Sequence, residues 1–292
     1  MKRTLSETLG TGTLYVLLLF FSLLTLYPFW HVLMYAFSDP KQSIGGGLFL
    51  WPKGFSLLSF QMLLESDGIF QAYRNSLFRL IIGTSINVVL TATLAYPLAN
   101  KRFVGRMQLT LFIFFTMLFQ GGMIPSYLLV KSLGLINTPW ALILPGAISA
   151  WNFFIMKNYF QSISPEIEES ANLDGSTPLR TLFSIIIPIS KPVIAAVALF
   201  YAVGHWNAYF DAVLYINSPS KQVLQVFLKG MLATSSLQQL GGTESFQSGI
   251  ASVTEESIKM ATVVISVLPM LIIYPFIQKY YVKGIMIGSV KG

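Results

Sequence analysis

The sequence predicts an all-α membrane protein that crosses the bilayer six times, and three observations support this prediction. Of its 292 residues, 54% are hydrophobic and only 11% are charged, whereas soluble domains carry about 25% charged residues. Six long stretches contain no Asp, Glu, Lys or Arg: 13–37, 80–99, 107–130, 132–156, 192–210 and 260–278. None of the six alternates polar and apolar residues, as the roughly 10-residue strands of a membrane barrel would.

The length of these stretches identifies them as transmembrane helices. A helix rises about 1.5 Å per residue, so about 20 apolar residues cross a hydrocarbon core of about 30 Å. Helices are required because lipid offers no partner to an unpaired backbone amide. The first stretch follows Lys2 and Arg3 and so imitates a secretory signal, but it is too long and lacks a small-x-small cleavage site near its end. We therefore expect residues 1–292 to form one transmembrane domain, with 13–37 as its first span.

One boundary between spans needs a turn. Only Lys131 separates the stretches 107–130 and 132–156, and one residue does not reverse a chain. The segment KSLGLINTPW (131–140) supplies Gly134, Asn137 and Pro139, which are residue types that favour turns. We expect the chain to reverse within this segment.

The basic residues predict the orientation. The segments 1–12, 100–106, 157–191 and 279–292 hold 11 of the 19 Lys and Arg residues, and basic loops remain on the cytoplasmic side. We therefore expect both termini in the cytoplasm. The net charge of +7 suits these flanks and their attraction to anionic lipid, so it does not require a nucleic-acid partner.

The most polar stretch between two apolar runs is EESANLDGSTPLRTLFSIIIPISKP, residues 168–192. Just before it, Ser164 suits the N-cap of a helix and Pro165 its first position. Three acidic side chains then follow near the positive end of the helix dipole, namely Glu166, Glu168 and Glu169. The pair Asp174 and Gly175 favours a turn that ends this helix.

A second short helix is predicted directly after that turn. Thr177 suits its N-cap and Pro178 its first position, and the helix runs to Pro188. Its apolar side chains recur at the helical spacing i, i+3, i+4, i+7: Leu179, Leu182, Phe183 and Ile186. A solvated loop is the alternative, but helices this short are marginal in water without something to pack on. We expect residues 160–191 to form an elbow that docks on a cytoplasmic partner.

This stretch resembles the EAA loop of the membrane subunits of bacterial ABC importers, Glu-Ala-Ala-x-x-Asp-Gly-Ala followed by an apolar helix ending Leu-Pro-x-x-x-Pro. Matching positions are Glu169, Ala171, Asp174, Gly175, Pro188 and Pro192, while Ser170, Ser176 and Ile187 depart from the pattern by small or apolar exchanges. The segments WPKGFSLLSFQ (51–61), WNAYFDAVLYI (206–216) and YYVKGIMIGSVKG (280–292) also resemble the maltose-type carbohydrate permeases. Among these, the branch associated with complex or acidic oligosaccharides is the most similar.

The resemblance implies a type I ABC importer permease fold in a bacterial inner (plasma) membrane, with a cytoplasmic coupling helix. It implies a carbohydrate cargo, in particular an oligosaccharide and among these an acidic, uronate-containing one. The implied partners are a second permease chain, two ATPase subunits that hold ATP and Mg, and an extracytoplasmic solute-binding protein. This chain would bind no cofactor and perform no catalysis. The residues implied to couple to the ATPase are Glu169, Ala171, Asp174, Gly175, Thr177 and Arg180.

The sequence gives little support for ATP binding by this chain itself, for ion-coupled transport or for a catalytic site. There is no G-x-x-x-x-G-K-[ST] phosphate loop, and the six spans lack the charged residues that a secondary, ion-coupled transporter usually carries. That transporter remains the alternative interpretation. With no cysteine and only His31 and His205 as histidines, we expect no metal site and no thiol nucleophile.

A substrate pathway is the least specific prediction. In GHWNAYFDA (204–212), the aromatic rings and the amide of Trp206, Asn207 and Tyr209 suit a sugar, but interfacial aromatic belts have the same composition. Gln120 and Asn152 are polar residues within spans, which line a pore or bond to a neighbouring helix. In the outer segment 211–259, a short helix at KQVLQVFLKGML (221–232) precedes a polar loop that we expect to contact the binding protein or the cargo.

Overall fold

The structure, a computed structural model, describes residues 5–233 and 254–289. Within these residues the secondary structure is helical, apart from one isolated bridge between Ser38 and Phe55. The predicted all-α class is therefore confirmed. The chain divides into two compact units, residues 1–69 with 228–267 and residues 70–227 with 268–292. The predicted polar loop after residue 233 lies outside the described residues.

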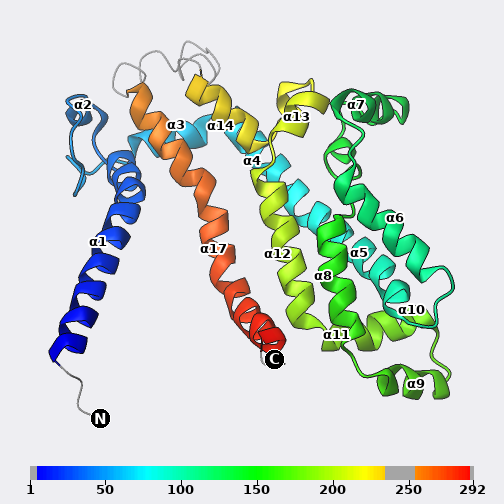
Figure 1. The fold of residues 1–292 in the computed structure, drawn as a ribbon. Coiled ribbons are helices and arrows are strands. Elements are labelled where there is room, and N and C mark those ends of the chain that lie inside the picture. The colour runs from blue at the N-terminus through cyan, green and yellow to red at the C-terminus, as the bar shows by residue number, and fades with distance from the viewer. Residues whose placement is uncertain (1–4, 234–253, 290–292) are drawn as a thin grey trace. The chain divides into compact units, whose positions relative to one another are not determined.

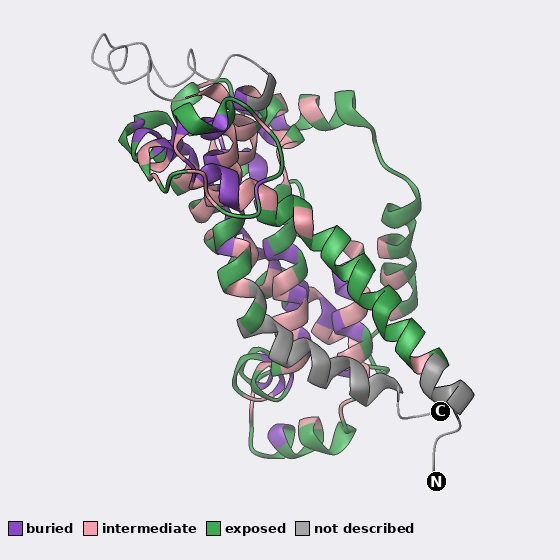
Figure 2. Cartoon of the chain, turned by 90° about the vertical axis from the view of Figure 1, so that its left-hand side faces the viewer, coloured by how far each residue is buried: buried purple, intermediate pink, exposed green. Residues whose placement is uncertain are grey.

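The first unit is dominated by one long apolar helix. It contains α1 (Leu5–Ala36), α2 (Pro40–Ser43), α3 (Leu58–Glu65), the end of α14 (Leu224–Ala233) and the first part of α17 (Glu255–Ser289). The end of α1 buries Met34 and Tyr35 against Phe49 and Met260. In contrast, the leucine- and phenylalanine-rich middle of α1 is exposed (Figure 2), as expected for a helix that faces lipid.

The second unit holds most of the helices. Along the chain they are α4 (Asp67–Phe78, which begins in the first unit), the π-helix η1 (Arg79–Gly83), α5 (Thr84–Ala99), α6 (Arg106–Leu118), α7 (Met123–Ser132), η2 (Pro139–Leu142), α8 (Ala150–Gln161), α9 (Pro165–Leu173), α10 (Pro178–Thr181), the π-helix η3 (Leu182–Ile186), α11 (Ile187–Ile189), α12 (Lys191–Asn207), α13 (Phe210–Tyr215) and η4 (Pro219–Lys221).

The core of this unit lies between α5, α8 and α12, which pack side by side (Figure 1). Ala92 and Ala95 of α5 are fully buried there, and such small residues let helix backbones approach closely in membrane bundles. The hydroxyl of Tyr201 on α12 lies 2.7 Å from Thr91 Oγ1 and accepts a hydrogen bond from the Ser149 amide at the start of α8. One side chain thus connects all three helices.

Two predicted spans are not continuous helices. The stretch 107–130 is broken into α6 and α7, whose axes differ by 117°, because the chain passes through Gly121 and Gly122 with the latter at φ 84°. Within the stretch 132–156, regular α-helix covers only Ser132, the end of α7, and residues 150–156 of α8. Helix α8 has 12 residues and extends past the stretch to Gln161, so it is about 18 Å long and too short to cross the hydrocarbon core. Pro139 and Pro145 interrupt the stretch, since neither ring fits a helix interior.

The predicted reversal after Lys131 is present. Gly134 adopts φ 69° and Asn137 φ 61°, left-handed conformations that glycine and asparagine adopt most readily. Within the described residues three helices are long and apolar enough to cross a membrane, and five if each of two bent pairs counts as one span. The second pair is Pro178–Ile189 with Lys191–Asn207, bent by 89°. The number of six spans stays a prediction.

Candidate functional site

The predicted elbow consists of two short helices beyond the end of the bundle. Figure 1 shows α9 past the end of α8, apart from the packed α5, α8 and α12. Ser164 occupies the N-cap position with Pro165 following it, but the Ser164 side chain makes no capping hydrogen bond. Ala171 is the buried residue of α9, whereas Leu173 is 89% exposed. Helix α9 therefore packs on the chain through Ala171 and leaves Leu173 uncovered.

The turn after α9 is a Schellman motif, the helix ending in which a left-handed residue closes two hydrogen bonds. Gly175 adopts φ 73°. Its amide donates to the Asn172 carbonyl at 3.0 Å, and the Ser176 amide donates to the Ala171 carbonyl at 2.9 Å. Asp174 is the C-cap residue. The predicted stop at Asp174 and Gly175 is therefore observed, and the glycine is needed because its φ lies in the left-handed region.

The second helix returns the chain to the bundle. The Thr177 hydroxyl accepts a hydrogen bond from the Arg180 amide, so the predicted cap is observed. Of the four apolar side chains predicted to form one face, Leu182 and Ile186 are buried in the core with α5, α8 and α12, while Leu179 and Phe183 are exposed. Two of the four side chains of the predicted face therefore anchor the elbow to the bundle, and the other two are not covered by the chain.

The motif glutamate is paired within the chain. Glu169 Oε1 lies 3.4 Å from Arg102 Nη2, in the basic loop after α5. Both side chains are largely exposed, so the pair contributes little stability. A cavity of about 480 Å³ lies beside it, lined by Lys101, Arg102, Glu168, Glu169 and residues of α8 and α9. An exposed, weakly held carboxylate next to a cavity is available to a cationic partner.

The predicted substrate residues are not gathered in one place. Trp206 is buried and packs edge-to-face on Tyr73, with ring centroids 5.8 Å apart. Asn152 is buried in α8. Asn207 and Gln120 are exposed, each at a break between helices, while Tyr209 is half-buried in the break between α12 and α13. Their role in the pathway stays a prediction.

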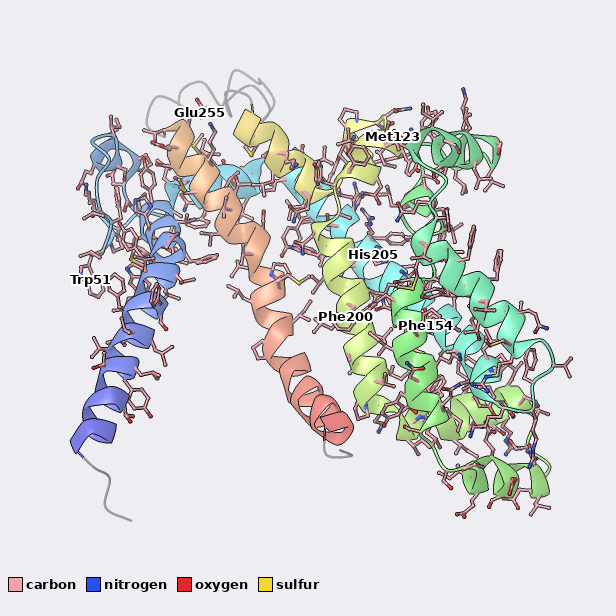
Figure 3. All side chains as sticks on the ribbon, viewed as in Figure 1. Trp51, Met123, Phe154, Phe200, His205 and Glu255 are labelled. Carbon is pink, nitrogen blue, oxygen red and sulfur yellow. The ribbon has the colours of Figure 1, made fainter. Side chains whose placement is uncertain are left out.

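A buried polar network, which sequence reasoning missed, holds that last break. Arg79 on η1 forms a bidentate ion pair with Asp211 on α13, and its Nη1 also donates to the Ala208 carbonyl at 3.4 Å. Its Nε donates to His205 Nδ1 at 3.3 Å, and His205 Nε2 lies 3.1 Å from the Asn87 side-chain amide. Figure 3 labels His205 on α12. The sequence feature that could have indicated this pair is that Arg79 and Asp211 have opposite charge and each lies next to the end of a predicted span.

Two neighbours show how tightly this network is packed. A β-carbon added to Gly83 on η1 would lie 2.7 Å from His205 Nε2, so only glycine fits there. On α13, burial and then the Asp211 carboxylate raise the pKa of Tyr215. The network thus fixes α12 and α13 around the break that contains Ala208 and Tyr209.

Comparisons with known proteins point to one family. The profile described as "Binding-protein-dependent transport system inner membrane component" matches residues 68–287. The polygalacturonan/rhamnogalacturonan transport system permease protein YtcP of Bacillus subtilis (strain 168) is 42% identical over 292 residues, the whole of both chains. Protein LplC of the same organism is 43% identical over 92% of this chain and 90% of its own.

A solved structure agrees with these relatives. A chain of a bacterial ABC transporter involved in the import of the acidic polysaccharide alginate superposes with a TM-score of 0.89 and 31% identity. The match covers 96% of this chain and 99% of that one. The resemblance to ABC importer permeases is confirmed, and the secondary-transporter alternative is not supported.

Proposed function

The chain belongs to the family of binding-protein-dependent transport system inner membrane components, and from this premise we propose that α9 is its coupling helix and an acidic oligosaccharide its cargo. It is a membrane-embedded permease subunit of a carbohydrate ABC transporter and is not itself an enzyme. A partner permease, an ATPase and a solute-binding protein complete such a system. Two ATPase copies that hold ATP and Mg, and a different second permease chain, are parts of the proposal.

The observation that carries the coupling role is the shape of the elbow. Helix α9 stands beyond the bundle with Leu173, Glu166 and Glu169 exposed, while its buried residue, Ala171, packs back toward the chain. The Gly175 turn and the Thr177 cap then hold it at a defined angle to the next helix. Glu169 would exchange its weak pair with Arg102 for a cation of the ATPase, and Arg180 is exposed on the same elbow.

The cargo is proposed from the relatives. The printed substrates are polygalacturonan or rhamnogalacturonan for one relative and the acidic polysaccharide alginate for the solved transporter. We infer an oligosaccharide that contains uronate, delivered by an extracytoplasmic binding protein. Trp206, Asn207, Tyr209, Asn152 and Gln120 remain the proposed pathway residues of this chain, with the partner permease supplying the opposite wall.

A charge reversal tests the coupling role. In the complex with its partners, Glu169→Lys places a second cation beside Arg102 and removes the carboxylate, so we expect at least about tenfold weaker binding of the ATPase subunits. Glu166→Lys is the matched control, because it reverses an exposed charge on the same helix outside the motif. Equal ATPase retention and equal uptake in both variants would refute the assignment of α9.

Cysteine labelling tests the topology on which the coupling role depends. The chain has no native cysteine, so Leu173→Cys on α9 supplies a single, exposed thiol. A membrane-impermeant maleimide should label it only in inside-out vesicles. Leu48→Cys, also exposed and in the predicted outer segment, should label only in the opposite orientation. Labelling of Leu173→Cys from outside would overturn the proposal, since no cytoplasmic ATPase reaches that side.

A further inference from the structure

A second cavity in the helical unit is lined by cations that form no ion pair within the part of the chain that the structure describes. It measures about 400 Å³ and lies between the basic loop after α5, the start of α6 and the end of α8. Its lining residues are Lys101, Phe103, Gly105, Arg106, Met107, Gln108, Thr110 and Lys157. Three are cations and none is acidic, whereas the cavity beside α9 contains Glu168 and Glu169 as well as cations. A cavity with this lining attracts an anion.

Lys157 is the residue that most needs an anionic partner. It is only 7% exposed, and no carboxylate among the described residues pairs with it. Its Nζ lies over the ring of Phe154, 5.7 Å from the ring centroid. Burying an ammonium without a counterion is costly, and Arg106 in the same cavity repels it. An anion in the cavity would remove both penalties.

Uncharged donors complete the lining. Thr110 Oγ1 is buried and has no hydrogen-bond partner within the described residues. Helix α6 begins at Arg106 without a side-chain cap, after Gly105 at φ 80°. Its first residues, Arg106 and Met107, line the cavity, so the positive end of the helix dipole lies beside it. Arg106 itself is held in place by its Nε, which donates to the Leu98 carbonyl at 3.0 Å.

The surroundings indicate a lipid rather than a soluble anion. Helix α6 has no buried residue, and large apolar side chains such as Leu111, Phe114 and Phe115 are exposed along it. The cations lie at the ends of the predicted spans on the side expected to be cytoplasmic, where anionic headgroups concentrate. The cavity is thus placed at headgroup depth, next to a helix that suits acyl chains.

We propose that this cavity binds the phosphate of an anionic phospholipid of the cytoplasmic leaflet, with Lys157, Lys101 and Arg106 as its cationic partners and the acyl chains along α6. The proposal concerns a surface other than α9 and the cargo pathway. Loss of coupling in the α9 variants would therefore leave it standing.

The test uses the full chain in a neutral detergent, titrated with dioctanoyl-phosphatidylglycerol, dioctanoyl-phosphatidylcholine or inorganic phosphate. Thermal unfolding and native mass spectrometry report binding. We expect phosphatidylglycerol to raise the melting temperature, and Lys157→Met to weaken its apparent affinity about fivefold. Lys191→Met is the matched control, because it removes an exposed lysine from the same side of the membrane and should leave the affinity unchanged.

Four results would overturn the proposal. Equal effects of phosphatidylcholine and phosphatidylglycerol would show that the headgroup charge is not recognised. Equal stabilisation by inorganic phosphate would identify a soluble anion as the ligand. An unchanged affinity in Lys157→Met would remove the central residue. Finally, a lower melting temperature of Lys157→Met without lipid would show that Lys157 is structural, whereas we expect an equal or higher one because an uncompensated charge is removed.

Discussion

The ion pair between Arg79 and Asp211 makes a sharp prediction, because its two partners are buried to different extents. The Arg79 side chain is 4% exposed and that of Asp211 is 30% exposed. In Asp211→Asn the buried guanidinium keeps only the Ala208 carbonyl, His205 and a neutral amide. Leaving a buried charge uncompensated costs about 3–5 kcal/mol, so we expect a loss of that size in the free energy of unfolding.

The reciprocal variant should be milder. In Arg79→Met the carboxylate that remains is partly exposed and recovers hydration, so we expect a loss of about 1–3 kcal/mol. The double variant, Arg79→Met with Asp211→Asn, leaves no unpaired charge and should be more stable than Asp211→Asn alone. Equilibrium unfolding in mixed micelles, followed by circular dichroism, measures all four proteins as a double-mutant cycle.

Two outcomes would refute this reasoning. If the free energy of unfolding of Asp211→Asn is within about 0.5 kcal/mol of the wild-type value, the Arg79 guanidinium does not depend on the Asp211 carboxylate as its counterion. If the losses of the two single variants simply add in the double variant, the pair has no coupling energy. Either result would mean that the break between α12 and α13 is held by packing rather than by charge.

Three further changes follow from single positions. Gly83→Ala should lower the melting temperature, because its β-carbon would clash with the neighbouring imidazole, whereas Gly204→Ala, with open space around it, should not. Gly175→Ala should strain the left-handed turn by about 1–2 kcal/mol and reduce transport-coupled ATPase activity without changing the melting temperature of the bundle. Leu182→Ala, in the core, should lower the free energy of unfolding by about 2–5 kcal/mol. Leu179→Ala changes an exposed residue and should lower it by about 0.5 kcal/mol or less. Equal melting temperatures of these two variants would contradict this expectation.

The features that the sequence predicted well depend on neighbours along the chain. The end of α9 at Gly175 and the cap of α10 at Thr177 involve residues within five positions of each other, so residue type alone indicates them. The same locality explains the reversal at Gly134 and Asn137. Ser164 shows the limit: its backbone is at the N-cap position, but its side chain makes no bond there.

Continuous membrane-spanning helices were harder to predict, because the mean hydropathy of a stretch carries no information on its backbone geometry. The stretch 107–130 contains no charged residue, yet Gly121 and Gly122 divide it. Similarly, the apolar residues around Pro145 satisfy the length criterion without forming one helix. In both places the composition indicates a membrane environment, while the glycines and prolines decide the path of the backbone.

Long-range pairs were beyond sequence reasoning for a different reason. Arg79 and Asp211 are 132 positions apart, and their pairing depends on how α12 packs against α5 and η1. Lys157 begins the segment 157–191 that the sequence predicts on the cytoplasmic side, and the fold buries its side chain. Neither fact follows from composition, since one sequence offers many possible partners for each charge.

The packing of the elbow explains why a push on α9 would reach the bundle. The helix after the Gly175 turn runs without a break from Pro178 to Ile189 and buries Leu182 and Ile186 in the core formed by α5, α8 and α12. Because close-packed interiors transmit strain instead of absorbing it, displacement of this helix must move the bundle with it. The joint between α9 and this helix is the Gly175 turn, whose two hydrogen bonds and left-handed glycine resist bending. A stiff joint on an anchored lever is what coupling to an ATPase requires, and a flexible loop at the same place would dissipate the motion.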